Sequence, residues 1–194
     1  MIMDYTIFAG VNGVGKTSLY RILKTDEDLG QRVNIDEIVS KYGDWRDNIL
    51  QIKAARSAMA LINKYIGEKT TFHQETTLPG PTILKQIDKA RKAGYRINLY
   101  YVGVENLEVA VQRVRKRVDK GGHGVDEKLI RERFEKMPET LHKLMPLCDT
   151  AFFYDNTRKF EQVAYLANNK LLDCAEDLPV WFWEFIAATD VKYY

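Results

Sequence analysis

The residues with the clearest chemical potential lie between Gly10 and Thr17, where the sequence reads GVNGVGKT. Gly10, Gly15, Lys16 and Thr17 fit the phosphate-binding pattern G-x-x-x-x-G-K-[ST]. In such a loop, backbone N–H groups bind phosphate, the lysine contacts the β and γ oxygens, and the final hydroxyl is a Mg²⁺ ligand. We therefore expect a polyphosphate site with Thr17 as the metal ligand. Its expected residues are Gly10, Asn12, Gly13, Val14, Gly15, Lys16, Thr17 and Ser18.

Two acidic residues follow short apolar segments at positions where strands are predicted to end. Asp36 comes after one such segment, and Glu75 closes the next. Ligands of doubly wound sheets bind at the carboxyl ends of the strands. We expect Asp36 to accept the proton of a substrate hydroxyl or to orient that hydroxyl; an N-cap of the following turn is the alternative. Glu75 is expected to hold Mg²⁺ through water or to bind substrate hydroxyls, and Thr76 and Thr77 to bind substrate or cap a turn.

Positive charge is concentrated in residues 113–137, which carry nine Lys and Arg against five Asp and Glu. Arg113 and Arg117 are four residues apart and share one edge of an apolar helical stripe. Arg133 lies among apolar residues of a second helical segment, where a charge needs an anionic partner. A glycine-rich connection separates the two segments. We expect a lid whose arginines close over a polyphosphate; an ordinary salt-bridged helical hairpin is the alternative.

The elements that must position these residues alternate between short apolar runs and helical patterns, which indicates βα units and a mostly parallel sheet. Asp44 is the expected N-cap of one long helix and Gly67 its stop. We expect strands at 5–9, 32–35, 69–75, 96–104 and 151–154, and helices at 16–23, 44–66, 82–93, 107–118 and 126–137.

The carboxyl-terminal part is predicted to form a hairpin and a helix. Asn168 and Asn169 separate two short strands as a two-residue turn. The aromatic segment around Trp181 and Trp183 either packs on the sheet as core or forms a docking surface. The whole pattern predicts an α/β fold of the P-loop NTPase class, nucleotide-kinase-like. A parallel sheet flanked by helices, an Arg-bearing helical lid and this hairpin plus helix form a single domain over 1–194.

Composition limits the classes of partner. Hydrophobic residues make up 45% of the chain and the net charge is +2, which argues against a nucleic-acid coat or a polybasic membrane arm. No apolar run approaches the roughly 18 residues of a membrane span, and the first residues lack a basic signal-peptide region. We expect a cytoplasmic protein with neither a nucleic-acid nor a membrane partner.

We expect mostly structural roles for the histidines and cysteines. His73 and His142 are expected to be structural, and His123 in the glycine-rich connection to face solvent; contact with a ligand is the alternative for His123. The two cysteines, Cys148 and Cys174, form no CxxC pair and no disulfide framework, and we expect both in or near the core.

Motifs that define other P-loop classes are missing. There is no N-K-x-D of a GTPase and no LSGGQ-like signature of a transporter ATPase. The late apolar strand ends in Asp155-Asn156 rather than in two acids, and this pair either borders the base site or forms a structural turn. The remaining features favour a kinase, since Asp36, Glu75 and the lid arginines match the needs of phosphoryl transfer.

Several stretches carry a family resemblance: AGVNGVGKTSL, VNIDEI, ETTLPG, the run from GYRINLYY to GGHGVDEKLIRERF, and YDNT. In this order they resemble zeta-toxin-like P-loop proteins, a group also labelled predicted ATPases. The resemblance covers about residues 4–157, and R-V-x-x-G-G-H-x-V followed by I-R-x-R-F is its most specific part.

The resemblance implies a P-loop kinase with a lid and, as in the toxins, ATP-dependent phosphorylation of a UDP-activated amino sugar. By motif, Lys16 matches the loop lysine, Asp36 the catalytic base, Arg117 and Arg133 the lid arginines, and Glu75 the acid of the substrate segment. An antitoxin protein is the implied partner.

We therefore expect a Mg²⁺–ATP-dependent small-molecule kinase in which Lys16, Asp36, Arg117 and Arg133 carry the reaction and Arg113 helps to bind ATP. A nucleotide-binding regulatory ATPase or switch acting on a protein partner is the alternative. An inert nucleotide-binding subunit of a larger complex is a third interpretation.

Overall fold

The computed structural model describes residues 2–26, 28–78, 80–189 and 191. Within these residues a seven-stranded sheet has the order β2-β3-β1-β4-β5-β6-β7. The strands from β2 to β5 run parallel, and β6 and β7 are added antiparallel at one edge. The strands are β1 (Met3–Ala9), β2 (Gln31–Asn34), β3 (Phe72–Thr76), β4 (Tyr95–Gly103), β5 (Thr150–Asp155), β6 (Glu161–Ala167) and β7 (Lys170–Cys174).

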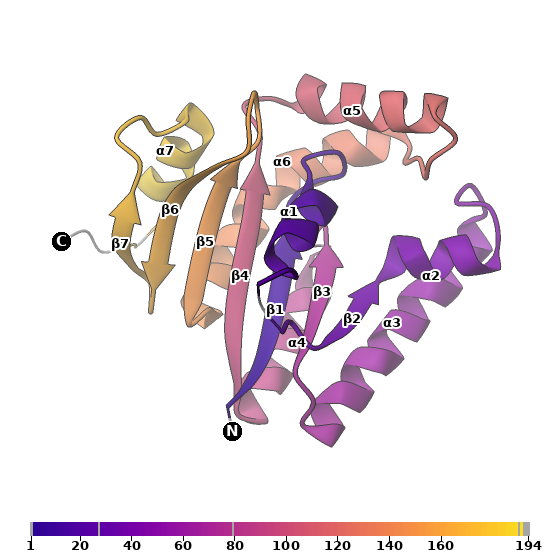
Figure 1. Cartoon of the computed structure of the whole chain (residues 1–194), viewed down its shortest axis with the longest axis horizontal. Helices are drawn as coiled ribbons and strands as arrows, with labels where there is room; N and C mark the ends of the chain where they lie inside the picture. The colour runs from indigo at the N-terminus through magenta and orange to yellow at the C-terminus, as the bar shows by residue number, and fades with distance from the viewer. Residues whose placement is uncertain (1, 27, 79, 190, 192–194) are drawn as a thin grey trace.

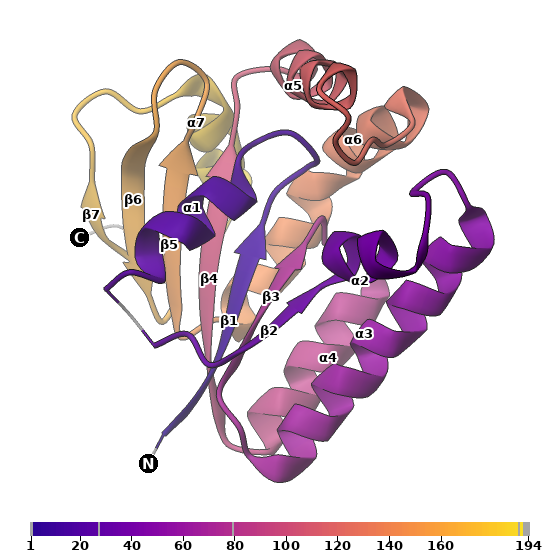
Figure 2. The same ribbon diagram turned by 45° about the vertical axis from the view of Figure 1, so that its right-hand side comes forward.

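Helices cover both faces of this sheet. Helix α1 crosses one face, whereas α4 and α6 lie behind the opposite face, as two views agree (Figures 1 and 2). The helices are α1 (Lys16–Leu23), α2 (Ile35–Tyr42), α3 (Asn48–Glu68), α4 (Pro81–Lys92), α5 (Leu107–Asp119), α6 (Glu127–Leu144) and α7 (Val180–Ala187), and a 3₁₀ turn, η1, spans Met145–Leu147. No helix in these described parts of the chain combines the length and hydropathy needed to cross a bilayer.

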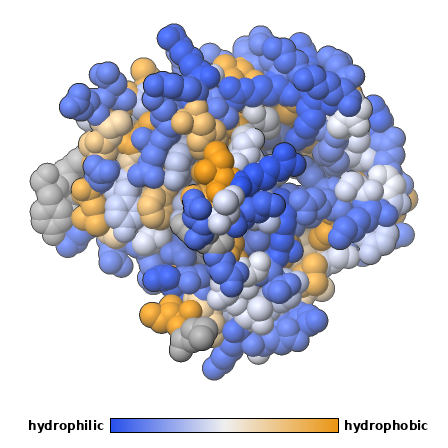
Figure 3. All heavy atoms as spheres, viewed as in Figure 1, coloured by the Kyte–Doolittle hydropathy of each residue, from blue (hydrophilic) through white to orange (hydrophobic). Residues whose placement is uncertain are grey.

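The core lies where the helices meet the central strands. Tyr5, Ile7, Phe8 and Ala9 of β1 are completely buried, because a parallel strand covered on both faces has no solvent side. On the face shown in Figure 3, hydrophilic residues dominate over α5, and apolar atoms are scattered in small groups. This distribution is normal for a globular surface.

Most predicted elements are confirmed within a few residues. Helix α1 has the predicted bounds, and the hairpin turns at Asn168 and Asn169, whose φ angles are 49° and 59°. Both angles lie in the left-handed region that this two-residue turn requires and that asparagine tolerates. The mostly parallel sheet is also confirmed.

The predicted helix 44–66 is wrong at both ends. Asp47, not Asp44, is the N-cap of α3: its carboxylate accepts hydrogen bonds from the N–H groups of Ile49 and Leu50. Both aspartates are good caps by type, so local preference could not choose between them. Gly67 does not stop the helix, which runs to Glu68. Helix α2 ends earlier, at Tyr42, and residues 43–47 form bends, turns and irregular backbone instead of helix.

Two further predictions need correction. The second lid helix does not end near Met137 but continues through Pro138 to Leu144. A proline inside a helix removes one hydrogen bond, and the buried stripe that includes Met137, Leu141 and Leu144 compensates. Cys148 is buried as expected, but Cys174 is exposed because it closes the edge strand β7.

Candidate functional site

The glycine-rich loop joins β1 to α1 at the carboxyl edge of the sheet. Its glycines have positive φ angles of 138° at Gly10, 87° at Gly13 and 108° at Gly15. A Cβ atom at Gly10 would overlap the carbonyl oxygen of Val102, and one at Gly13 would overlap that of Ala110. The loop therefore packs between β4 and α5 in a form that only glycine adopts. No side chain caps the amino end of α1, so its N–H groups are left for an anionic ligand.

Lys16 extends back along this loop. Its Nζ donates hydrogen bonds of 2.9 Å to the carbonyl oxygens of both Gly10 and Val11. Burial lowers the pKa of Lys16 to about 8, while the nearby carboxylates of Glu75 and Asp36 raise it. The positive charges of Arg133 and Arg117 lower it further. Three cationic side chains thus gather at one place, which suits a ligand with several negative charges.

Thr17 lies opposite the end of β3. Its hydroxyl donates a 2.8 Å hydrogen bond to Oε2 of Glu75, whose Oε1 accepts from Nη2 of Arg32 at 2.5 Å. The carboxylate of Glu75 is buried, with 7% of its side chain exposed. Hydroxyl and carboxylate oxygens are the donors that Mg²⁺ prefers, and Mg²⁺ keeps several of its waters. The pair therefore fits that ion, although the described residues contain no cluster of three acidic, His or Cys ligands.

Arg32 was missed in the sequence interpretation. Besides Glu75 it bonds Glu37, with 2.7 Å between Nη2 and Oε1, and its guanidinium stacks 3.8 Å from the ring centre of Tyr20. The contact with Glu75 depends on the parallel register that pairs Asn34 of β2 with Glu75 of β3. The sequence signal for this ion pair is an arginine directly before the buried end of a short strand.

Asp36 lies in the first turn of α2 and does not cap it. The cap is Asn34, whose Oδ1 accepts from the N–H groups of Asp36 at 2.9 Å and Glu37 at 3.3 Å. The alternative role of Asp36 as an N-cap is therefore wrong. Its carboxylate is 44% exposed and lies 3.3 Å from Nε2 of His123.

A cleft of about 750 Å³ opens in front of Lys16 and Asp36. Its wall includes Glu75, Thr76 and Thr77, as the sequence suggested, and also Trp45, which was not singled out. The hydroxyl of Thr76 accepts a 3.0 Å hydrogen bond from the N–H of Leu78, so this residue has the turn-forming role that was left open.

The lid arginines reach this region from α5 and α6. Nη1 of Arg133 donates a 2.7 Å hydrogen bond to Oδ1 of Asn12 in the loop. Nε and Nη2 of Arg117 are buried and have no hydrogen-bond partner among the described residues. The same holds for Nη1 of Arg113, whose Nη2 donates to the carbonyl oxygen of Thr157 at 3.2 Å. Buried guanidinium groups without partners are unfavourable until an anion pairs with them.

The ion pairs of the hairpin lie elsewhere on it. Arg115 pairs with Glu127, and Arg131 lies 3.9 Å from Glu108, all with half-exposed side chains. The description as a salt-bridged hairpin therefore applies to the solvent side, while Arg117 and Arg133 face the loop.

Asp155 and Asn156 form a structural turn that supports the loop. Nδ2 of Asn156 donates 2.7 Å to the carbonyl oxygen of Val14, and Oδ1 of Asp155 accepts 2.8 Å from the indole N–H of Trp181. The structural alternative for this pair is thus confirmed, and a contact with a nucleotide base stays a prediction. Trp181 packs against Gly103, so this part of the aromatic end belongs to the core.

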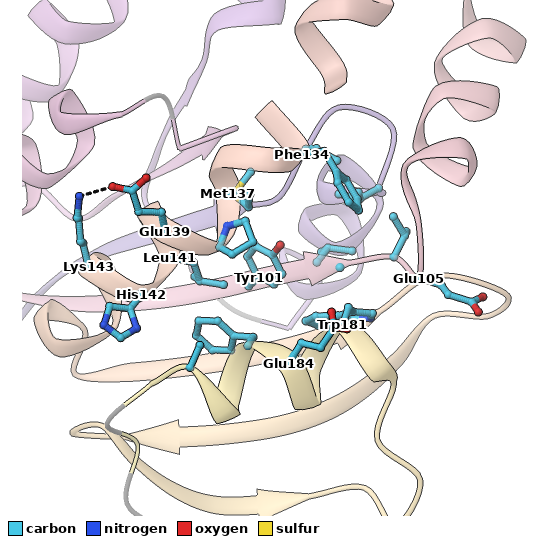
Figure 4. A pocket seen from close by; sticks show the side chains of 18 residues that line it. Tyr101, Glu105, Phe134, Met137, Glu139, Leu141, His142, Lys143, Trp181 and Glu184 are labelled. Carbon is cyan, nitrogen blue, oxygen red and sulfur yellow. Dashed lines mark hydrogen bonds and ion pairs between the residues drawn. The ribbon is translucent and has the colours of Figure 1, made fainter. Parts of the chain in front are cut away.

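A second cavity of about 500 Å³ lies behind the loop, between β4, α6 and α7. Figure 4 shows Tyr101 and Trp181 directed into it opposite Met137 and Phe134. Its lining is mainly apolar, and the one lysine there, Lys143, is paired with Glu139 at 2.6 Å. Charged groups suited to phosphate therefore gather at the cleft and not here.

Comparison with known proteins identifies the family. The Zeta toxin family model matches residues 4–169. The chain belongs to the zeta toxin family. A protein of Haemophilus influenzae is 29% identical over 128 residues, which cover 66% of this chain and 89% of that protein. The resemblance found in the sequence is therefore confirmed.

Solved structures show the same fold at low identity. The PezAT chromosomal toxin–antitoxin system of Streptococcus pneumoniae gives a TM-score of 0.61 at 14% identity, covering 95% of this chain and 84% of that chain. The AvrRxo1-ORF1:AvrRxo1-ORF2 structure with sulphate ions gives a TM-score of 0.67 at 14% identity, covering 99% of this chain and 66% of that chain. The same complex with ATP gives a TM-score of 0.64 at 13% identity, covering 98% of this chain and 65% of that chain. The predicted α/β, P-loop kinase-like fold is confirmed.

Proposed function

We propose that this zeta toxin family member is a Mg²⁺–ATP-dependent phosphotransferase that acts on a hydroxyl group of a small molecule. One observation carries the proposal: Asp36 and Lys16 line the same cleft, beside guanidinium nitrogens of Arg117 that lack a partner among the described residues. An acid, a phosphate-binding lysine and an unpaired cation at one place are what phosphoryl transfer requires. Family membership supports an ATP-dependent phosphotransferase in general.

The loop residues supply the donor site. The N–H groups of Gly13, Gly15 and the start of α1 bind the phosphates of ATP, and Lys16 exchanges its carbonyl partners for phosphate oxygens. Thr17 and Glu75 hold Mg²⁺, which when bound neutralises charge on the phosphates. Ser18, exposed in the first turn of α1, adds its N–H to the same site.

Asp36 and the lid arginines complete the transfer. Asp36 takes the proton from the acceptor hydroxyl as the oxygen–phosphorus bond forms and the bond from the γ-phosphorus to its bridging oxygen breaks. Arg117 and Arg133 stabilise the charge on the moving phosphoryl group, and Arg113 joins them at the nucleotide. ADP leaves with the electron pair of the broken bond.

The acceptor we propose is a UDP-activated amino sugar, the substrate implied by the family. The cleft volume falls in the usual range of small-molecule pockets, and Thr76 and Thr77 offer the acceptor polar contacts. Structures of toxin–antitoxin and two-protein complexes among the similar folds support a protein antitoxin as the partner of this chain.

Phosphate transfer from γ-labelled Mg²⁺–ATP into a panel of nucleotide sugars tests the proposal. We expect label in a UDP-amino sugar with the unmodified chain, and none with Asp36→Asn or Lys16→Ala. Asp36→Asn should keep its affinity for ATP, since Asp36 does not bind the nucleotide. Slow hydrolysis of ATP without transfer to any sugar, at a rate unchanged by Asp36→Asn, would overturn the kinase proposal and favour a nucleotide-dependent switch.

A further inference from the structure

The connection between α5 and α6 brings a histidine to the proposed catalytic base. His123 was expected to face solvent, but only 15% of its side chain is exposed, and its Nε2 lies 3.3 Å from Oδ1 of Asp36. The prediction of a solvent-facing loop histidine is therefore wrong. The two residues are far apart in sequence and meet because the connection folds down over the cleft, whose wall includes them both.

Two neighbouring contacts hold the connection in this place. The imidazole of His123 lies 5.8 Å, between ring centroids, from the indole of Trp45 in the segment between α2 and α3. A Cβ atom at Gly124 would overlap that indole, and one at Gly122 would come within 2.7 Å of Cγ of Arg117. The same short connection therefore touches the acid on one side and a lid arginine on the other.

The charges around His123 favour a neutral imidazole. Burial and the positive charge of Arg117 lower its pKa, while the carboxylates of Asp36 and Asp44 act in the opposite direction. A neutral imidazole has one N–H, which can be on Nε2 when the other nitrogen is unprotonated. When this N–H turns toward the nearby Oδ1, the other oxygen of Asp36 stays available for the acceptor.

We propose that His123 is a positioning residue that fixes the carboxylate of Asp36 when the lid lies over the cleft. This inference rests on the proposed function. Because His123 and Arg117 belong to one connected segment, the base is oriented in the same event that brings the cation to the phosphate. The acceptor's proton goes to Asp36, and His123 keeps its own proton throughout.

Three variants separate this role from simple packing. His123→Gln keeps an N–H donor, and His123→Leu keeps apolar bulk against Trp45 without a donor. The control, His142→Ala, removes an exposed histidine of α6 that does not line the cleft. We expect kcat for phosphate transfer to fall roughly 10- to 100-fold in His123→Leu, the range expected when a reacting group is no longer held in place. His123→Gln should recover most of the rate, and His142→Ala should match the unmodified chain.

Binding and a second readout keep the outcomes distinct. The Kd for ATP should stay within about threefold in both His123 variants, because His123 does not touch the nucleotide loop. Hydrolysis of Mg²⁺–ATP, with water as acceptor, is measured beside transfer and should follow the same order. Suppose that Asp36→Asn abolishes both rates. If His123→Leu is then as active as the unmodified chain, or more active than His123→Gln, the inference about His123 is overturned while the proposed function stands. If Asp36→Asn changes neither rate, the proposed function fails and the inference with it.

Discussion

The hydroxyl of Thr17 donates a 2.8 Å hydrogen bond to Oε2 of Glu75, although 58 positions separate the two residues. The parallel register that pairs Phe8 of β1 with Glu75 of β3 brings them together. Thr17 is the last residue of the phosphate-binding pattern, and Glu75 ends an adjacent strand. The pairing therefore fixes where a divalent cation would lie relative to the loop.

The first prediction concerns this pair. Thr17→Val keeps the shape of the side chain but removes the hydroxyl, so the Mg²⁺ concentration for half-maximal activity should rise about 10- to 100-fold. Thr17→Ser keeps the hydroxyl and should stay within about threefold. A Mg²⁺ titration of ATP turnover makes the measurement. Equal Mg²⁺ requirements in the valine and serine variants would remove Thr17 from the metal site.

The second prediction concerns the pH dependence of ATP binding. Without nucleotide, Lys16 loses its proton around pH 8, whereas bound polyphosphate favours the charged form. Above pH 8, ATP binding should take up a proton, and the affinity should fall by up to about tenfold per pH unit. Calorimetry in buffers of different ionisation enthalpy, at about pH 7 and about pH 9, measures the uptake.

The lowered pKa of Lys16 also defines a control variant and the direction in which stability changes with pH. Replacing the exposed Lys41 by Met should leave the uptake unchanged, and equal uptake at both pH values in the unmodified chain would contradict the prediction. The native pKa of Lys16 lies below its ordinary value of 10.5. Between pH 8 and 10.5 the unfolded chain therefore binds more protons, and the stability of the nucleotide-free fold should rise with pH through that window.

The third prediction compares two glycines with positive φ. Gly121→Ala, at φ 78° with no atom within 4 Å of the new Cβ, should cost only backbone strain, about 1–2 kcal/mol. Gly13→Ala, at φ 87°, adds an overlap with the carbonyl oxygen of Ala110. It should therefore lower the free energy of unfolding further and weaken ATP binding. Urea denaturation of both variants provides the comparison, and equal losses would show that the loop moves freely away from α5.

The fourth prediction concerns a residue beyond the matched family region. Trp181→Phe removes the N–H that donates to Asp155, and a lost hydrogen bond to a charged group should cost about 1.5–3 kcal/mol of unfolding free energy. Trp183→Phe is the control, since Trp183 is 53% exposed and should change stability by less than about 0.5 kcal/mol. Chemical denaturation measures the free energy of unfolding of both variants, and an activity assay checks that both are folded. A neutral Trp181→Phe would mean that the Asp155 turn is held by its other contacts.

Local patterns account for what the sequence predicted well. The loop from Gly10 to Thr17 follows from residue type and spacing, and the turn at Asn168 and Asn169 from the preference of asparagine for left-handed backbone. Neither depends on distant parts of the chain. Asp36 could also be placed at the carboxyl edge, because that edge is where any parallel strand ends.

What the sequence did not predict depends on contacts between distant segments. The role of Arg32 needs the register between β2 and β3, and the approach of His123 to Asp36 needs the connection after α5 to fold onto Trp45. The length of α6 was missed because a rule for proline competes with a buried apolar stripe, and tertiary packing decided the outcome.

The two carbonyl oxygens that hold Lys16 also bear on how a reaction cycle ends. The ammonium group has partners in the loop before any nucleotide arrives, at 2.9 Å from the oxygens of Gly10 and Val11. In the proposed function, nucleotide binding would therefore exchange these partners for phosphate oxygens, and departure of the spent nucleotide would reverse the exchange. Because the lysine would regain two hydrogen bonds as ADP leaves, it would not be left as an unpaired buried charge that retains the product. In the proposed function, the loop would thus limit product inhibition through the same residues that bind the donor.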